Sequence, residues 1–279
     1  SNSRASMSSN YFLNALNNSL PTSVEVNWRQ ETGSTNDDLK AAARRNAFRH
    51  PVLLTVERQT AGRGTHGRGW QTAELAMIFS LGLPLRDGLL SAPPGMLSIA
   101  AAMSIARSAS MASNEKVLVK WPNDVWTAGG KAGGILIETV GDANGVRSIV
   151  IGVGLNLSIA PGGVTTAGWP IRAISTRVSM SDPTMRGEFL GLIVSDLINT
   201  FMAIEKSHDF SEIIDKWPLY DAFYGKSVAW RTLDKPDVPL EGINKGIDAL
   251  GRLILQGRRG EKSELSGELV SLLGNSHRE

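Results

Sequence analysis

Apolar and polar positions along the chain follow the periods of strands as well as helices. Residues 24–30 alternate apolar and polar side chains, which is typical of a strand with one covered face. Apolar runs bounded by turn residues predict buried strands at 51–58, 76–85, 116–121, 133–140 and 146–157. The last two runs are separated by the turn sequence GDANG, so we expect them to form an antiparallel hairpin.

Three segments carry the signals of helices. Residues 93–112 are apolar and alanine-rich on all sides, which predicts a helix buried over most of its surface. Residues 184–206 place apolar side chains on one helical face and predict an amphipathic core helix. Another helix is predicted to begin at Thr35, because Asp38 three positions later completes a capping box.

The order of these elements predicts the fold class and the domains. Helices and strands are mixed, with hairpins as well as crossovers, which favours an α+β fold with a mixed sheet flanked by helices. After about Tyr220 the chain changes to short strands with glycine turns, which indicates a small β-barrel. We expect a poorly ordered segment at 1–21, a main domain at 22–220 and a small β domain at 221–279.

Composition and charge exclude several classes of protein. The 279 residues carry a net charge of +2, too small an excess for a general nucleic-acid binder. The absence of cysteine excludes disulfides and thiolate zinc sites, and the four histidines show no ligand spacing. The N-terminus has no secretory signal, and the apolar run at 148–160 is too short to cross a bilayer. We therefore expect a soluble cytoplasmic protein.

A glycine-rich stretch, QTAGRGTHGRGW at residues 59–70, directly follows one of the predicted buried strands. Backbone N–H groups of such loops can bind phosphate, and Arg63 and Arg68 add charged donors. The spacing matches neither the phosphate-binding loop nor the dinucleotide fingerprint, so a mobile surface hairpin is an equal alternative. Trp70 at its end is either a core residue or a platform on which a base stacks.

The stretch KWPND, residues 120–124, displays two polar side chains at the end of a predicted strand. Pro122 stops the strand, which leaves Asn123 and Asp124 outside the ladder. Their oxygen atoms suit a hard cation such as Mg²⁺, and Lys120 suits a phosphate. A type I turn without ligands is the alternative interpretation.

Two more polar residues interrupt apolar surroundings. Lys131 precedes Gly133 and Gly134, where small residues let an anionic ligand approach the backbone; a solvated lysine in a hairpin turn is the alternative. Asn156 lies inside an apolar strand, where its amide needs hydrogen-bond partners. It is either a satisfied core residue or a ligand contact.

The combination of stretches is more specific than any one of them. TGSTN, QTAGRGTHGRGW, KWPND, KAGGI and GVGLN occur in this order, each at a strand end. Over roughly residues 24–275 this set resembles the biotin protein ligases, which are biotin–[acetyl-CoA-carboxylase] ligases. The resemblance implies a class II synthetase-like biotin/lipoate ligase core followed by an SH3-like β-barrel.

The resemblance also implies an activity. Members of this family form biotinyl-5′-AMP from biotin and ATP, with Mg²⁺, and then transfer biotin to one lysine of a biotin carboxyl carrier domain of an acyl-CoA carboxylase. The resemblance implies no nucleic-acid or membrane partner, and a monomer or weak homodimer. Residues 1–23 are too few for the DNA-binding domain of bifunctional members, so we expect a ligase and not a repressor.

Individual residues acquire roles by the same resemblance. Arg63 and Lys131 would lie at the biotin carboxylate and its junction with the phosphate, and with Lys120 they would form the catalytic set. The implied biotin-binding residues are Ser34, Thr35, Asn36, Gln59, Gly62, Arg63, Gly64, Thr65, Lys131, Gly133 and Gly134. The implied ATP-binding residues are Arg68, Trp70, Lys120, Asn123, Asp124, Lys131 and Asn156, with Asn123 and Asp124 also near Mg²⁺.

One departure from the family pattern concerns the glycine-rich stretch. The common form reads Gly-Arg-Gly-Arg, whereas here Thr65 replaces the second arginine, so we expect weaker retention of biotinyl-AMP. Lipoate–protein ligase is the enzymatic alternative, since it shares the adenylation chemistry. A nucleic-acid-binding module conflicts with the low net charge, and a silent biotin-binding scaffold conflicts with the intact Lys120 and Lys131.

Overall fold

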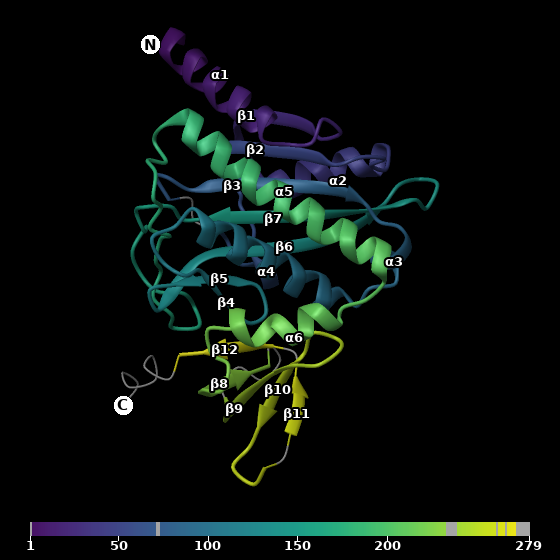
Figure 1. Ribbon diagram of the computed structural model, residues 1–279, viewed down its shortest axis with the longest axis vertical. Coiled ribbons are helices and arrows are strands. Elements are labelled where there is room, and N and C mark those ends of the chain that lie inside the picture. The colour runs from purple at the N-terminus through teal and green to yellow at the C-terminus, as the bar shows by residue number, and fades with distance from the viewer. Residues whose placement is uncertain (1, 71–72, 233–238, 261, 266, 272–279) are drawn as a thin grey trace.

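Two β-sheets organise the chain in the computed structural model, which describes all residues except 1, 71–72, 233–238, 261, 266 and 272–279 (Figure 1). The larger sheet consists of β1 (Glu25–Thr32), β2 (Val52–Gln59), β3 (Met77–Pro84), β4 (Leu118–Lys120), β5 (Asp124–Thr127), β6 (Gly130–Gly141) and β7 (Arg147–Leu155). Its order is β1-β2-β3-β7-β6-β5-β4, with β1 and β2 parallel and the other neighbours antiparallel. The predicted α+β class with a mixed sheet is confirmed.

Helices cover both faces of this sheet. They are α1 (Asn2–Asn18), α2 (Thr35–Arg45), α3 (Asp87–Leu90), α4 (Pro94–Met111), α5 (Pro183–Ser207) and α6 (Ser211–Tyr220). Helices α4 and α5 pack on one face, and α2 packs on the other (Figure 1). On β2, Leu53 therefore faces the larger core cluster while Leu54 faces the α2 cluster, which explains why this strand reads as a continuous apolar run.

Helix α5 is the core helix that residues 184–206 predict. By length and composition alone it is long and apolar enough to cross a membrane, yet 56% of that window is buried inside the protein. Phe189, Leu197 and Phe201 belong to the core cluster, with Phe201 only 1% exposed. Its apolar character is therefore used for packing against the sheet.

The N-terminal segment differs from its prediction. Residues 1–21 were expected to be poorly ordered, but α1 is a helix that packs along α5. Phe12 and Leu16 are buried, and Gly187 of α5 admits the close approach, since a Cβ there would lie 2.4 Å from the Phe12 carbonyl oxygen. The prediction was wrong because a serine- and asparagine-rich composition conceals two apolar residues at helical spacing, which only the neighbouring helix makes effective.

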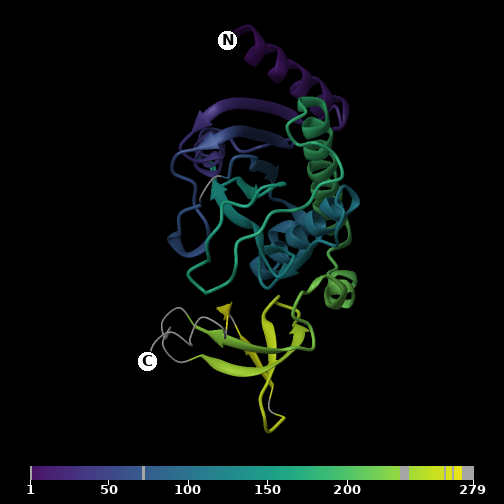
Figure 2. The ribbon, with the colours of Figure 1, turned by 90° about the vertical axis from the view of Figure 1, so that its left-hand side faces the viewer.

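The smaller sheet follows α6. It consists of β8 (Ser227–Arg231), β9 (Leu240–Ile247), β10 (Leu253–Gln256), β11 (Lys262–Leu265) and β12 (Glu268–Val270), in the order β11-β10-β9-β8-β12. It lies beside the β4 edge of the larger sheet (Figures 1 and 2). Trp121 Nε1 donates to the Gly251 carbonyl at 3.0 Å, which ties the two sheets together.

Two short elements were not anticipated. Strand β5 begins at Asp124 and pairs with β4, so KWPND is a tight hairpin rather than a strand end followed by a turn. Helix α6 contains Pro218 in its last turn, which speaks against a helix there, although Ile213, Ile214, Trp217 and Tyr220 recur at helical spacing.

Candidate active site

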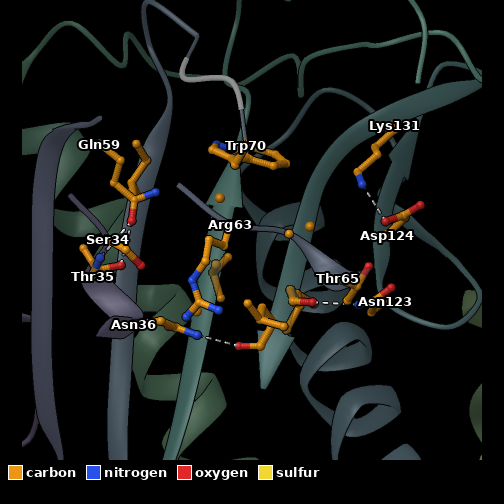
Figure 3. A pocket seen from close by; sticks show the side chains of 18 residues that line it. Ser34, Thr35, Asn36, Gln59, Arg63, Thr65, Trp70, Asn123, Asp124 and Lys131 are labelled. Atoms are coloured by element: carbon orange, nitrogen blue, oxygen red, sulfur yellow. Dashed lines mark hydrogen bonds and ion pairs between the residues drawn. The ribbon is translucent and has the colours of Figure 1, made fainter. Parts of the chain in front are cut away.

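A cleft lies over the larger sheet between the start of α2, the 60–70 loop and strand β6 (Figure 3). It consists of two cavities that share the lining residues Gly64, Thr65, Trp70, Asn123, Asp124 and Lys131. We call the part lined by Ser34, Thr35, Asn36 and Gln59 the hydroxyl end, and the part lined by Lys120, Asp124 and Lys131 the lysine end. The second cavity, beyond Trp70, has a volume of about 420 Å³.

The hydroxyl end is built on the first turn of α2. Ser34 has an extended backbone and accepts a hydrogen bond from the Asp37 N–H at 3.4 Å, so it is the N-cap. The predicted capping residue, Thr35, is wrong by one position. Thr35 is instead the first helical residue, and its N–H donates to Gln59 Oε1 at 2.9 Å. Both residues are buried at the cavity wall.

Asn36 supports this end from below. Its amide nitrogen donates to Glu138 at 2.9 Å and to the Leu136 carbonyl at 3.2 Å. Its Oδ1 lies 2.6 Å from the buried Ser80 hydroxyl. Gly152 makes room for it, because a Cβ there would lie 2.3 Å from Asn36 Oδ1.

The glycine-rich stretch is a hairpin that lines both cavities. Trp70 N–H donates to the Gly62 carbonyl at 2.8 Å and Gly64 N–H donates to the Arg68 carbonyl at 2.7 Å. A single 3₁₀ turn, Thr65–Gly67, closes it, with Gly67 at a φ of 71°. The stretch is therefore a hairpin, as one sequence interpretation predicts, and it also lines a cleft, where a ligand could contact it.

Trp70 forms the wall between the two cavities. Its indole packs over β7, where a Cβ on Gly154 would lie 2.6 Å from the ring. Gly134 on β6 lies beside it, whereas a Cβ on Gly133 would point at Leu155 and Val125 on the other side of the strand. Gly134 thus lines the cleft and Gly133 does not. Among the described residues, Trp70 Nε1 is buried without a hydrogen-bond partner.

Arg63 and Lys131 are directed to different carboxylates. Arg63 Nη2 lies 2.6 Å from Asp37 and 3.2 Å from Glu138. Burial lowers the pKa of Arg63, but the two carboxylates outweigh burial and raise it. Lys131 Nζ instead lies 2.9 Å from Asp124. Both residues line the first cavity, so the two cations that the resemblance places at one junction lie in one site but are paired with different carboxylates.

The lysine end is a charge cluster formed by Lys120 and Asp124 of the β4–β5 hairpin and by Lys131 of β6; Lys120 is buried, and Asp124 and Lys131 are partly buried. Asp124 Oδ2 lies 2.9 Å from Lys120 Nζ and Asp124 Oδ1 lies 2.9 Å from Lys131 Nζ. Burial alone would raise the pKa of Asp124, but the two ammonium groups outweigh burial and hold it below its ordinary value. One carboxylate and two ammoniums leave a local excess of positive charge facing the second cavity.

Asn123 and Asn156 use their amide nitrogens for structure. Asn123 Nδ2 donates to the Ile135 carbonyl at 2.7 Å, and Asn156 Nδ2 donates to the Arg172 carbonyl at 3.1 Å. The Asn156 Oδ1 atom is buried and has no hydrogen-bond partner within the described part of the chain. Because Asn156 lines the second cavity, it presents an acceptor there.

Arg68 contacts the smaller sheet. Its guanidinium lies 2.8 Å from Glu268 on β12, and Glu268 also accepts from Arg231 at 2.8 Å. Burial would raise the pKa of Glu268, but the two arginines lower it. Glu268 lines the second cavity, so the small β domain contributes to the cleft.

Several residues of the site escaped the sequence analysis. Glu138 left one signal, since it is a charged residue within the apolar run GGILIETV. Gly152 and Gly154 lie in the motif GVGLN, of which only Asn156 was assigned a role, and Ser80 gave no signal that separates it from an ordinary strand residue. Glu268 could not be found, because nothing in its own segment indicates that β12 lies against a loop 200 positions away.

The donor set for a metal ion is small. In the described residues no group of three or more His, Cys, Asp or Glu side chains could hold an ion. Asp124 is the carboxylate at the lysine end, and both of its oxygens already contact ammonium groups. These residues fit Mg²⁺ only if phosphate oxygens supply most of its ligands.

Comparisons with known proteins agree with this architecture. Residues 29–156 match the Biotin/lipoate A/B protein ligase family. A biotin–[acetyl-CoA-carboxylase] ligase of Paracoccus denitrificans is 32% identical over 214 residues, which cover 75% of this chain and 85% of that protein. The corresponding ligase of Mycobacterium tuberculosis is 43% identical over 143 residues, which cover 48% of this chain and about half (52%) of that protein.

Solved structures show the same fold. The biotin protein ligase of Aquifex aeolicus in complex with biotin and ATP aligns with a TM-score of 0.67 at 22% identity. The alignment covers 88% of this chain and 97% of that one, so it includes both sheets. An enzyme of Helicobacter pylori, biotin acetyl coenzyme A carboxylase synthetase, aligns with a TM-score of 0.59 at 19% identity and supports the same arrangement.

Proposed function

Because the chain belongs to the biotin–[acetyl-CoA-carboxylase] ligase family, we propose that it attaches biotin to a protein lysine in two steps at one cleft. In the first step the biotin carboxylate attacks the α-phosphate of ATP, which gives biotinyl-5′-AMP and pyrophosphate. In the second step a carrier lysine amine attacks the acyl carbon and AMP leaves.

The observation that carries this proposal is the joining of two different chemistries in one cleft. The hydroxyl end offers neutral donors and acceptors, which suit the ureido ring of biotin with its carbonyl and two N–H groups. The lysine end offers two ammonium groups, one buried and one partly exposed, which suit a carboxylate approaching a polyphosphate. A ligand that spans both ends has a neutral polar head and an acidic tail.

In the first reaction two anions, the biotin carboxylate and the ATP phosphates, approach each other, so their negative charge must be neutralised. Lys131 lies where the tail of a ligand bound at the hydroxyl end reaches the second cavity, so we assign it to the carboxylate and the α-phosphate. Lys120 and Arg68, which line the second cavity only, are assigned to the remaining phosphates. Arg63 is assigned to holding the glycine hairpin against α2 through Asp37.

Trp70 and Asn156 are assigned to the adenine ring. The indole supplies a flat apolar surface beside the second cavity, and the unpartnered Asn156 Oδ1 accepts from the adenine amino group. Mg²⁺ would enter with ATP and neutralise phosphate charge, held by phosphate oxygens with Asp124 or Asn123 nearby. Weaker retention of biotinyl-AMP because of Thr65 stays a prediction.

The protein substrate is assigned from the relatives. The ligases of Paracoccus denitrificans and Mycobacterium tuberculosis are named for acetyl-CoA carboxylase, so the proposed acceptor is a lysine of its biotin carboxyl carrier domain. That amine must lose a proton before it attacks, so transfer should accelerate as pH rises from about 6.5 to 8.5. Because the reaction uses ATP, we propose the cytoplasm as its compartment.

Transfer of [¹⁴C]biotin tests the proposal directly. The protein, ATP and Mg²⁺ are incubated with a biotin carboxyl carrier domain, and radiolabelled lipoate is run in parallel. We expect label on the carrier with biotin only, and none when the acceptor lysine is replaced. Label from lipoate instead would make the chain a lipoate ligase, and no label from either would refute the ligase activity.

A further inference from the structure

We propose that Glu138 and Ser80 are positioning residues that set the direction of the hydrogen bonds at the hydroxyl end, so that Thr35 presents an acceptor to the cleft. The inference rests on the proposed function, because an acceptor at this point serves a ligand with N–H donors. A continuous chain of hydrogen bonds joins Glu138, Asn36, Ser80 and Thr35.

Glu138 begins the chain of hydrogen bonds. Its carboxylate lies 2.8 Å from Lys40 Nζ and 3.2 Å from Arg63 Nη2, and it accepts from Asn36 Nδ2 at 2.9 Å. Burial would raise the pKa of Glu138, but these three donors lower it, so the group is ionised at neutral pH. An ionised carboxylate can only accept hydrogen bonds.

This acceptor fixes the orientation of the Asn36 amide. The other contact on the same side is the Leu136 carbonyl at 3.2 Å, which also accepts only. The amide nitrogen must therefore face Glu138 and Leu136, and Oδ1 must face the opposite side. There the Ser80 hydroxyl lies 2.6 Å away and supplies the proton.

Ser80 has one proton for two short contacts. Its oxygen lies 2.6 Å from Asn36 Oδ1 and 2.7 Å from Thr35 Oγ1, and Ser80 is fully buried. Because Asn36 Oδ1 takes the Ser80 proton, the second contact is a hydrogen bond only if Thr35 donates to Ser80. Two oxygens at 2.7 Å without a proton between them would repel.

The lone pairs of Thr35 are then left for the cleft. Gln59 Oε1 is the other acceptor within reach of the Thr35 hydroxyl, at 3.2 Å, but it already accepts the Thr35 N–H at 2.9 Å and lies farther away than the Ser80 oxygen at 2.7 Å. Fixing Gln59 Oε1 also leaves Gln59 Nε2 as the donor of that amide. Thr35 thus offers an acceptor and Gln59 a donor, which together complement an N–H and a carbonyl on one ring.

Substitution of Glu138 by Gln disturbs these hydrogen-bond directions with little change in the shape of the side chain. A glutamine has one acceptor oxygen, yet Lys40 and Asn36 both donate to position 138, so one donor would face the amide nitrogen. We expect biotin affinity to fall on the order of tenfold, the loss of about one hydrogen bond, while ATP affinity and the rate at saturating biotin stay within about twofold.

The test is a double-mutant cycle in the full-length protein. Biotin and ATP dissociation constants are measured by calorimetry for wild type, Glu138→Gln, Ser80→Ala and the double variant, with thermal midpoints to verify folding. If Glu138 acts through Ser80, each single variant loses about tenfold for biotin and the double variant loses no more than either. Lys40→Met, which leaves the carboxylate in place, is the matched control and should retain biotin affinity within about threefold.

The outcomes separate this inference from the proposed function. Wild-type protein that fails to bind biotin refutes the proposed function. Normal biotin binding by either Glu138→Gln or Ser80→Ala, or losses that add in the double variant, overturns the positioning role. Should Glu138→Gln fail to fold, Ser80→Ala alone still decides, since it removes the link between Asn36 and Thr35 without a charge change.

Discussion

The two ends of the cleft keep their polar groups buried in different ways. At the hydroxyl end, Thr35, Asn36 and Ser80 hydrogen-bond to one another and to the backbone, so the end has its final chemistry before a ligand binds. At the lysine end, Lys120 and Lys131 share the single carboxylate of Asp124. A polyphosphate there must take over cations that the free protein has already paired.

This difference reflects the ligand that each end suits. A neutral ring is recognised by hydrogen bonds whose directions are fixed in advance, which costs the protein only local order. An anion needs cations, and buried cations without a partner are too costly to keep. The lysine end therefore carries its own counterion, and substrate binding there is an exchange of partners.

The largest expected effect comes from removing a cation at the lysine end. Lys131→Met should slow adenylation by about 10²–10³-fold, because the charge that stabilises the reacting phosphate is lost. Biotin-dependent ATP–pyrophosphate exchange measures this step. Lys40→Met carries the same substitution beside the hydroxyl end and should keep the exchange rate within a few-fold; equal losses would mean that the two ends do not differ as described.

Removal of the counterion should act on stability more than on chemistry. Asp124→Asn leaves the buried ammonium of Lys120 and the partly exposed one of Lys131 without their counterion and should lower the free energy of unfolding by about 3 kcal/mol. Urea denaturation measures it, and ATP should restore part of the loss. Ser80→Ala at the hydroxyl end removes only neutral hydrogen bonds and should cost about 1 kcal/mol.

The carboxylates that pair with cations around the cleft should make the stability of the protein depend on pH. The pKa values of Asp124, Glu138 and Glu268 are held below their ordinary values by neighbouring cations. Groups with a lowered pKa stabilise the fold above the unfolded value of about 4 and lose that contribution as pH falls toward the folded value. Unfolding free energy should be level from about pH 7 to 5 and fall below about pH 4, less steeply in Asp124→Asn.

Alanine substitutions of two glycines on β7, Gly152 and Gly154, should have effects of intermediate size on ligand affinity. A methyl group on Gly152 would contact Asn36, and one on Gly154 would contact Trp70. Gly152→Ala should therefore weaken biotin binding about tenfold with little effect on ATP, and Gly154→Ala should do the reverse, since overpacking of this kind costs about 1–3 kcal/mol. Calorimetry with each ligand decides; a parallel loss of both affinities in either variant would contradict the separation.

The smallest expected effect is at the contact with the smaller sheet. Glu268 competes with phosphate for Arg68 and adds negative charge to the second cavity. Because the Arg68 side chain is partly exposed, Glu268→Gln should lower the KM for ATP by only about two- to threefold and leave the KM for biotin unchanged. A higher KM for ATP would indicate that Glu268 positions Arg68 instead of competing for it.

The fold was predictable where periodicity is strong. The strands at 51–58, 76–85 and 146–157 and the helices at 93–112 and 184–206 have one pattern over many residues, and the structure confirms them within a few positions. Strand β5 was missed because it has only four residues and directly follows the turn at Pro122, although its partners β4 and β6 are its neighbours in the chain. Helix α1 was missed because its stability comes from α5, which lies far away in sequence. Local propensity carries no information about such partners.

For the site, the sequence by itself determined which chemical groups are present. Five short motifs at strand ends contain the hydroxyls, amides, lysines and glycines that line the cleft, because functional residues must follow rigid strands to be positioned. It could not determine which cation faces which anion. Arg63 pairs with Asp37 and Glu138, and Arg68 with Glu268, because long side chains reach partners that only the packing of α2, β6 and β12 brings near. Hydrogen-bond direction at Thr35 likewise depends on Ser80 and Glu138, which are distant in sequence and adjacent only in the folded protein.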